Sequence, residues 1–151
     1  MTDSIVYGAI KYDWVVGKST PIRMDEVPFK VFERSFCMEK DVLNALRKSW
    51  SIQSSSKWSV DNPAKGQCGV TSLVVQDILG GEIRKTFLEE GWHFYNIING
   101  ERKDFSEEQF PYLIDYQDID SNRVEAFQDT NDSQYRYLKT QVYKLLGKAE
   151  N

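Results

Sequence analysis

The feature that most constrains the fold of this chain is the dipeptide Asn99-Gly100, which separates two strand-like runs, GWHFYNII and ERKDF. Asn-Gly is the strongest short-range signal for a β-hairpin with a two-residue turn. Such a turn pairs Ile98 with Glu101, and this pair fixes the register of all the others. The sequence therefore predicts an antiparallel hairpin made of strands 92–98 and 101–105.

This register determines which side chains share a face of the hairpin. Tyr95 is placed opposite Asp104, and His93 shares the face of Tyr95 because side chains two residues apart point the same way. Asp104 is then the diagonal neighbour of His93, at about 7–8 Å between Cα atoms, which an imidazole and a carboxylate can bridge. A three-residue loop would instead turn Asp104 to the opposite face, so the pairing depends on the turn.

Helical patterns surround the predicted hairpin. Apolar residues recur every three or four positions over 39–50, 67–79 and 132–146, and Gly80-Gly81 and Gly147 follow the last two of these segments as stop signals. A further strand-like run, GEIRKTFL, precedes the hairpin. The combination predicts an α+β fold in which the 67–79 helix packs on an antiparallel sheet.

The 151 residues of the chain are typical of one folded domain, which we expect over 36–151. Residues 1–35 alternate only loosely between apolar and polar, in the runs IVYGAIKYDWVV and PFKVFERSF. This pattern predicts an N-terminal extension that forms two short strands or an extended arm. Such an arm would offer a surface for oligomerisation.

Charge and composition exclude several classes of function. The chain has 19 Lys and Arg against 23 Asp and Glu, a net charge of −4, and no basic cluster, so we expect no nucleic-acid partner. It has no apolar stretch of about 18 residues and no basic flank at its start, so we expect a cytoplasmic protein without a membrane span. The single histidine excludes a multi-histidine metal site, and no nucleotide-binding motif occurs, so we expect neither metal nor cofactor.

Only two cysteines occur, Cys37 and Cys68, too few for a disulfide framework. Cys68 lies in the first turn of the predicted 67–79 helix. There, the positive end of the helix dipole and the unpaired N–H groups favour a thiolate over a thiol. Position alone is equally compatible with a small buried side chain, which is the usual role of a free cysteine.

Cys68, His93 and Asp104 together could supply thiol acyl chemistry. That chemistry needs a thiolate that attacks, an imidazole that moves protons and a carboxylate that fixes the imidazole tautomer. Separately, His93 could be a strand histidine bonded to a backbone carbonyl, and Asp104 a solvated acid. The combination favours the catalytic interpretation. Gln53 and Ser51, polar and upstream, are the candidates for a second donor to an oxyanion.

Three segments of the sequence resemble the bacterial YunG-like family. They are SWS at 49–51, WSVDNPAKGQCGVTSLVVQDILGGEI at 58–83, and HFYN with DFSEEQF within 93–110. The resemblance covers roughly residues 40–146, and its most specific part is the NPA-x-GQC core combined with a spaced His and Asp.

The resemblance implies a papain-like, or transglutaminase-like, fold in which the nucleophile opens a helix packed on an antiparallel sheet. It also implies Cys68 as nucleophile, His93 as base and acid, and Asp104 as the residue that orients the imidazole. We therefore expect a cysteine hydrolase or acyl transferase that acts on an amide or thioester through an acyl-Cys68 intermediate. Peptidase, amidase, deamidase and transglutaminase activities all remain open.

Two other functions are compatible with the same residues. The chain could be a non-catalytic peptide- or protein-binding module on a papain-like scaffold, with a groove lined by Trp58 and Trp92. It could also be a redox sensor without a substrate, because an exposed low-pKa thiolate at Cys68 would oxidise readily.

Overall fold

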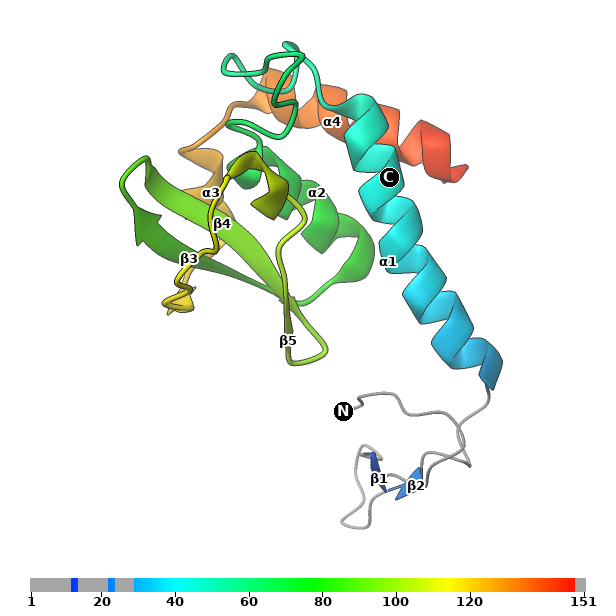
Figure 1. Cartoon of the computed structure of the whole chain (residues 1–151). Coiled ribbons are helices and arrows are strands. Elements are labelled where there is room, and N and C mark those ends of the chain that lie inside the picture. The colour runs from blue at the N-terminus through cyan, green and yellow to red at the C-terminus, as the bar shows by residue number, and fades with distance from the viewer. Residues whose placement is uncertain (1–11, 14–21, 24–28, 149–151) are drawn as a thin grey trace. The chain divides into compact units, whose positions relative to one another are not determined.

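The computed structural model describes residues 12–13, 22–23 and 29–148, with side chains over 38–148. The chain divides into two compact units, residues 1–39 and 40–151. In the first unit, strands β1 (Tyr12–Asp13) and β2 (Ile22–Arg23) pair antiparallel (Figure 1).

Most of residues 1–28 lie outside the described residues, and so do the predictions made for them. For residues 29–35 the prediction of an extended segment is wrong. PFKVFERSF was expected to be extended, whereas helix α1 (Phe29–Ser49) already includes nearly all of this run and begins ten residues before the predicted helix start at 39. Phe29, Phe32 and Phe36 are spaced as on one face of a helix, a pattern that the alternation concealed. The predicted domain boundary at residue 35 therefore falls inside α1.

The second unit contains a four-stranded antiparallel sheet in the order β5-β4-β3-β6. Its strands are β3 (Glu82–Leu88), β4 (Gly91–Ile98), β5 (Glu101–Lys103) and β6 (Ile119–Asp120). Strands β3, β4 and β5 follow one another through tight turns, and β6 pairs with β3 at the opposite edge of the sheet.

The turn at Asn99-Gly100 confirms the predicted hairpin register. Its two residues have φ of 53° and 81°, and both lie in the left-handed region that a type I′ turn requires. Ile98 pairs with Glu101, as predicted. However, β5 ends at Lys103 rather than at 105, so Asp104 follows the strand instead of pairing within it.

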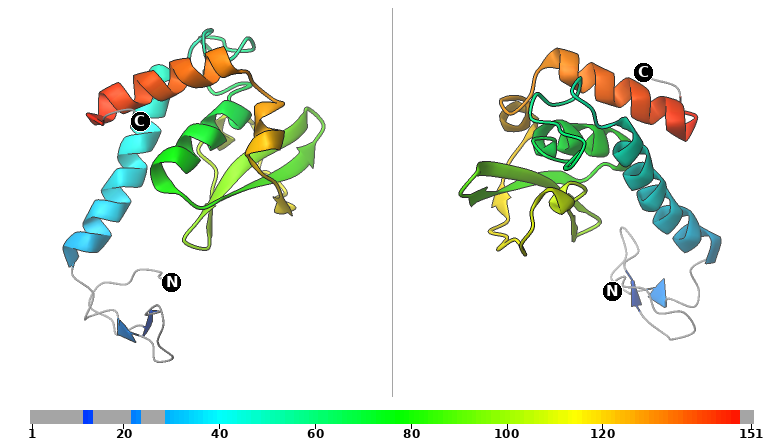
Figure 2. Two further views of the ribbon diagram at one scale, coloured as in Figure 1. Left: turned by 180° about the vertical axis from the view of Figure 1, so that it is seen from behind. Right: turned by 45° about the horizontal axis from the view of Figure 1, so that its top comes forward.

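Besides residues 40–49 of α1 and a short 3-10 helix, η2 (Glu107–Gln109), the second unit contains α2 (Cys68–Leu79), α3 (Arg123–Phe127) and α4 (Asp132–Leu146). The first eight residues of α2, 68–75, are all buried. Strand β4 covers one side of this helix, and α3 and α4 cover the other (Figure 2). Helices α2 and α4 agree with the predicted segments. Helix α3 is one turn long and was not predicted.

The core of the second unit lies between α2 and the sheet. One buried cluster joins the two layers, and its members are Cys68, Leu73, Ile83, Phe94 and Ala126. The unit is therefore α+β, as the sequence predicts, with the start of α2 built into the core. Among the described residues, no helix is both long enough and apolar enough to cross a lipid bilayer.

Candidate active site

A pocket with a volume of about 890 Å³ opens beside the start of α2. Cys68 and His93 both line it, together with Asp129 from the segment after α3 and the rings of Trp92 and Phe110. Cys68 and His93, two of the three residues that the sequence predicts to act together, therefore share one cavity. The third, Asp104, contacts His93 directly.

Cys68 reaches the pocket where the edge of β4 is not covered by another strand. Because β5 ends at Lys103, the backbone of β4 near Trp92 and Phe94 has no strand partner on that side among the described residues. Cys68 Sγ occupies this edge, 3.9 Å from the carbonyl oxygen of Trp92, and accepts a hydrogen bond from the backbone N–H of Phe94. The thiol is thus buried in the core but faces the pocket.

Asp129 is the residue that the sequence did not identify. Its Oδ2 lies 3.5 Å from Cys68 Sγ and accepts a hydrogen bond of 3.1 Å from the backbone N–H of Gly69. A Cβ atom at Gly69 would lie only 2.6 Å from this oxygen, so the glycine after Cys68 makes the close approach feasible. Sixty residues of chain separate Gly69 from Asp129, and no local pattern marks Asp129.

The surroundings of Cys68 oppose the thiolate that a position at the start of a helix favours. Burial raises the pKa of the Cys68 thiol, and the negative charge of Asp129 raises it further. The Phe94 N–H lowers this pKa, but by less. Loss of hydration raises the pKa of Asp129 as well, although part of that residue remains exposed. These surroundings therefore outweigh the favourable position at the start of a helix and favour the thiol form of Cys68.

His93 and Asp104 form a buried pair. His93 Nε2 lies 2.6 Å from Asp104 Oδ2, and the two side chains are only 2% and 3% exposed. Because a carboxylate only accepts hydrogen bonds, the partner assigns the proton to Nε2 and leaves Nδ1 as an acceptor. Nδ1 is buried and has no hydrogen-bond partner among the described residues. The imidazole thus keeps a free lone pair, and His93 lines the pocket that Cys68 also lines.

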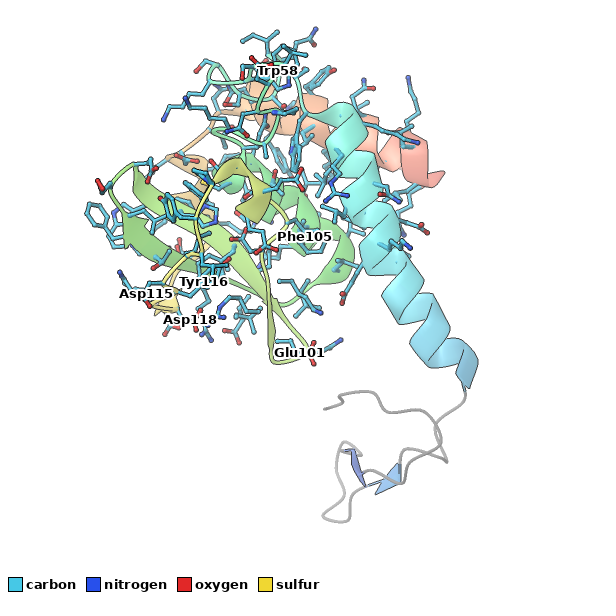
Figure 3. All side chains as sticks on the ribbon, viewed as in Figure 1. Trp58, Glu101, Phe105, Asp115, Tyr116 and Asp118 are labelled. Atoms are coloured by element: carbon cyan, nitrogen blue, oxygen red, sulfur yellow. The ribbon has the colours of Figure 1, made fainter. Side chains whose placement is uncertain are left out.

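Asp104 is held by further donors from the segment that follows it. Its Oδ1 accepts a 3.1 Å hydrogen bond from the backbone N–H of Ser106, and its Oδ2 accepts one of 2.8 Å from the hydroxyl of Tyr116. Tyr116, labelled in Figure 3, is in turn covered by the guanidinium of Arg102, 4.3 Å from the ring centroid. Burial and the charge of Asp104 raise the pKa of Tyr116, so its hydroxyl remains a donor.

Aromatic rings fix the orientation of the His93 imidazole. Phe110 meets it edge to face at 4.9 Å between ring centroids, and Tyr95 lies 5.9 Å away on the same face of β4. Tyr95 is anchored by its hydroxyl, which donates a 2.9 Å hydrogen bond to Asp118. The position of the imidazole is therefore set by neighbours in β4 and in the segment after β5.

Of the residues predicted for the oxyanion site and the groove, Trp92 lines the pocket and the other three do not. Ser51 and Gln53 belong to the turn after α1, where Ser51 Oγ accepts a 3.0 Å hydrogen bond from the Gln53 N–H, and neither is among the residues that line the pocket. Trp58 is also absent from the pocket lining and lies well away from Tyr116 (Figure 3). Trp92 does line the pocket, and it is 43% exposed.

Within the described part of the chain, no group of three or more His, Cys, Asp or Glu side chains could hold a metal ion. The nucleophilic and proton-carrying residues at the pocket are instead arranged as two pairs, Cys68 with Asp129 and His93 with Asp104. This arrangement is suited to moving protons and to attack by sulfur.

Comparison with known proteins identifies relatives of the second unit. Residues 38–147 match the family model described as "YunG protein". The chain is 57% identical over 94 residues to "Uncharacterized protein YunG" of Bacillus subtilis (strain 168), an alignment that covers 62% of this chain and 82% of that protein. No solved structure matches the chain.

Proposed function

The chain belongs to the YunG family, and from the geometry of its pocket we propose that it is a cysteine hydrolase or acyl transferase acting on an amide or thioester. In this proposal Cys68 is the nucleophile, His93 the proton carrier and Asp104 the residue that orients the imidazole. One observation supports it most: the buried Nδ1 of His93 has no hydrogen-bond partner among the described residues, and His93 lines the same pocket as Cys68.

The first step starts from a neutral thiol, because burial and Asp129 raise the pKa of Cys68. As Sγ attacks the carbonyl carbon of the substrate, its proton passes to His93 Nδ1, and Asp104 stabilises the imidazolium through Nε2–H. The carbonyl oxygen becomes an oxyanion. The backbone N–H of Cys68, which lies in the first turn of α2 and has no intrahelical acceptor, is placed to donate to it.

The tetrahedral intermediate then collapses. The bond from carbon to the leaving nitrogen or sulfur breaks, His93 returns the proton to the leaving group, and a thioester of Cys68 remains. In the hydrolase, His93 next takes a proton from water as the water oxygen attacks this thioester, which releases a carboxylic acid and restores the thiol. In an acyl transferase, an amine or another nucleophile replaces the water.

The proposal includes a relationship to papain-like, or transglutaminase-like, enzymes. Support comes from the way α2, which begins at Cys68, packs against β4, which contains His93. The antiparallel sheet and the Cys-His-Asp order along the chain agree with that arrangement.

A second candidate function is a non-catalytic module that binds a peptide in the same pocket. Its support is the raised pKa of Cys68, which a binding protein tolerates and a preformed thiolate–imidazolium pair would not have. Its groove would use Trp92 and Phe110 rather than the predicted Trp58.

The two functions can be distinguished with p-nitrophenyl acetate, an activated ester that acylates nucleophilic thiols. With Cys37→Ser as the background, we expect one acetyl group per chain on Cys68, detected by mass spectrometry. Cys68→Ala abolishes it, and His93→Ala slows it by about 10²-fold or more because general base catalysis is lost. Asp104→Asn also slows the reaction, whereas Asp61→Asn, at an exposed acid, does not.

Circular dichroism verifies that each variant is folded. Acetylation that continues at the original rate in Cys68→Ala contradicts the enzymatic function. Acetylation of Cys68 that does not depend on His93 also contradicts it, and supports the binding module.

A further inference from the structure

Asp129 is the acidic residue of the pocket that contacts Cys68, and it forms no ion pair with a described residue, although the more distant charges of Lys57 and His93 lower its pKa. Glu125 also lines the pocket, but it lies 3.0 Å from the ammonium of Lys85 and accepts a hydrogen bond from Ser121. Glu90 accepts a hydrogen bond of 2.8 Å from the hydroxyl of Tyr112. Among the described residues, by contrast, no Lys, Arg or His nitrogen lies within ion-pair distance of Asp129, which is bonded only to the Gly69 N–H and the thiol.

A carboxylate at this position opposes the proposed reaction in the empty pocket. The attack of Cys68 builds negative charge on the substrate oxygen and requires the thiol to lose its proton, and a second negative charge 3.5 Å from Sγ disfavours both. A cation bound to Asp129 would cancel this effect. The residue is therefore compatible with catalysis when the substrate itself brings a positive charge next to the carbonyl under attack.

The distances restrict where that charge can be. A carbonyl carbon in position for attack lies about 3–3.5 Å from the sulfur. Asp129 Oδ2 is 3.5 Å from Sγ, so a group hydrogen-bonded to this oxygen is a near neighbour of the same carbon. An ammonium on the adjacent α-carbon fits this spacing, and one at the end of a long side chain does not unless the chain folds back.

We propose, on the basis of the function above, that the acyl group attacked by Cys68 bears a protonated amine on its α-carbon and that Asp129 binds this amine. The substrates are then α-aminoacyl compounds with an unblocked amino group. The unpartnered Nδ1 of His93, 2% exposed as a side chain, is the independent sign that this pocket receives a reacting ligand. Binding of the amine neutralises Asp129 and so activates the thiol as the substrate arrives.

The test uses two chloromethyl ketones of alanine, one with a free amine and one with an N-acetylated amine. Each alkylates Cys68 with loss of chloride, and the rate is followed by intact-protein mass spectrometry in the Cys37→Ser background. The pH is set to about 6, where an α-amine is protonated. We expect the free-amine probe to react at least about tenfold faster, as for a charge-assisted hydrogen bond.

Two substitutions locate the origin of this preference. Asp129→Asn keeps an oxygen that can accept from Gly69 and should remove the preference. Glu125→Gln removes a charge from the same pocket and should leave the preference intact, because Glu125 is already paired with Lys85. The comparison of the two probes on the unmodified pocket does not depend on the stability of either variant.

Equal rates for the two probes, or a preference that persists in Asp129→Asn, would overturn the inference. Failure to alkylate Cys68 with either probe would overturn it too. The proposed function is tested separately by the acetylation of Cys68 and its dependence on His93. If that dependence is found and no amine preference accompanies it, only the aminoacyl specificity is wrong.

Discussion

Asp104 and Asp129 contact the two members of the candidate pair, His93 and Cys68, and each carboxylate favours a different protonation state. Asp104 binds the Nε2–H of His93 and favours the imidazolium that forms when Nδ1 takes a proton. Asp129 accepts the hydrogen bond of the thiol and favours the state before proton transfer. In the proposed mechanism the balance between these two carboxylates decides when the proton leaves the sulfur.

The pH dependence of alkylation measures this balance. Because a nearby negative charge raises the pKa of a thiol, Asp129→Asn should lower the pKa of Cys68, and alkylation by iodoacetamide in the Cys37→Ser background should begin at lower pH. In the unsubstituted pocket, alkylation should become rapid only on the alkaline side of the free-thiol value of about 8.5. Glu125→Gln is the matched control and should shift the profile less. A profile that is unchanged or moves to higher pH in Asp129→Asn would show that Asp129 does not determine the thiol pKa.

At the scale of the elements, the sequence predicted the structure correctly where residues within one short segment determine it. The turn at Asn99-Gly100 set the β4–β5 register because both residues adopt positive φ, and α4 ends at Gly147 in the left-handed conformation. The start of α1 was missed because FKVFERSF contains both an alternating and a helical pattern. Helix α3 was missed because its five residues are fewer than two helical turns, too few to establish a period.

Helix α2 meets α3 and Asp129 at Gly69, where there is no room for a side chain. A Cβ there would lie 2.6 Å from Asp129 Oδ2 and 2.9 Å from the carbonyl oxygen of Ala126. Gly69→Ala should therefore lower the free energy of unfolding by about 1–3 kcal/mol, although alanine is about 1 kcal/mol better than glycine inside a helix. Urea unfolding measures the change.

The double substitution Gly69→Ala with Asp129→Gly removes the side chain that the new methyl group would strike. In that background Gly69→Ala should cost less, because only the contact with the Ala126 carbonyl remains. An unfolding midpoint that rises in the single variant would mean that α2 and α3 separate readily and that the close approach is unimportant.

At the scale of the whole molecule, the site depends on contacts that bring distant segments together. The His93–Asp104 pair could be predicted because a hairpin register links residues only 11 apart. The Cys68–Asp129 contact spans 61 residues and depends on how α3 packs on α2, which no sequence period specifies. The contact of Tyr116 with Asp104 could not be predicted either, because Tyr116 belongs to an irregular segment that crosses back to Asp104. The sequence thus indicated the contact between His93 and Asp104 but not the contacts that Asp129 and Tyr116 make with Cys68 and Asp104.

The same packing couples the site to the stability of the second unit. Leu73 is fully buried in the cluster that also contains Cys68 and Phe94, so a cavity at Leu73 would open within the cluster to which the thiol belongs. Leu73→Ala should lower the free energy of unfolding by about 2–5 kcal/mol. Leu113→Ala is the matched control, because Leu113 is 98% exposed and the same substitution there should change stability by no more than about 0.5 kcal/mol.

Urea unfolding followed by tryptophan fluorescence measures both leucine variants, and iodoacetamide alkylation reports on the thiol in the same samples. Because Leu73 belongs to the same buried cluster as Cys68, we expect its loss also to weaken the burial that raises the thiol pKa and to speed alkylation at neutral pH. If Leu73→Ala destabilises the unit but leaves the alkylation rate unchanged, packing in this cluster would not control the reactivity of the thiol, and the charge of Asp129 would be the better explanation of its raised pKa.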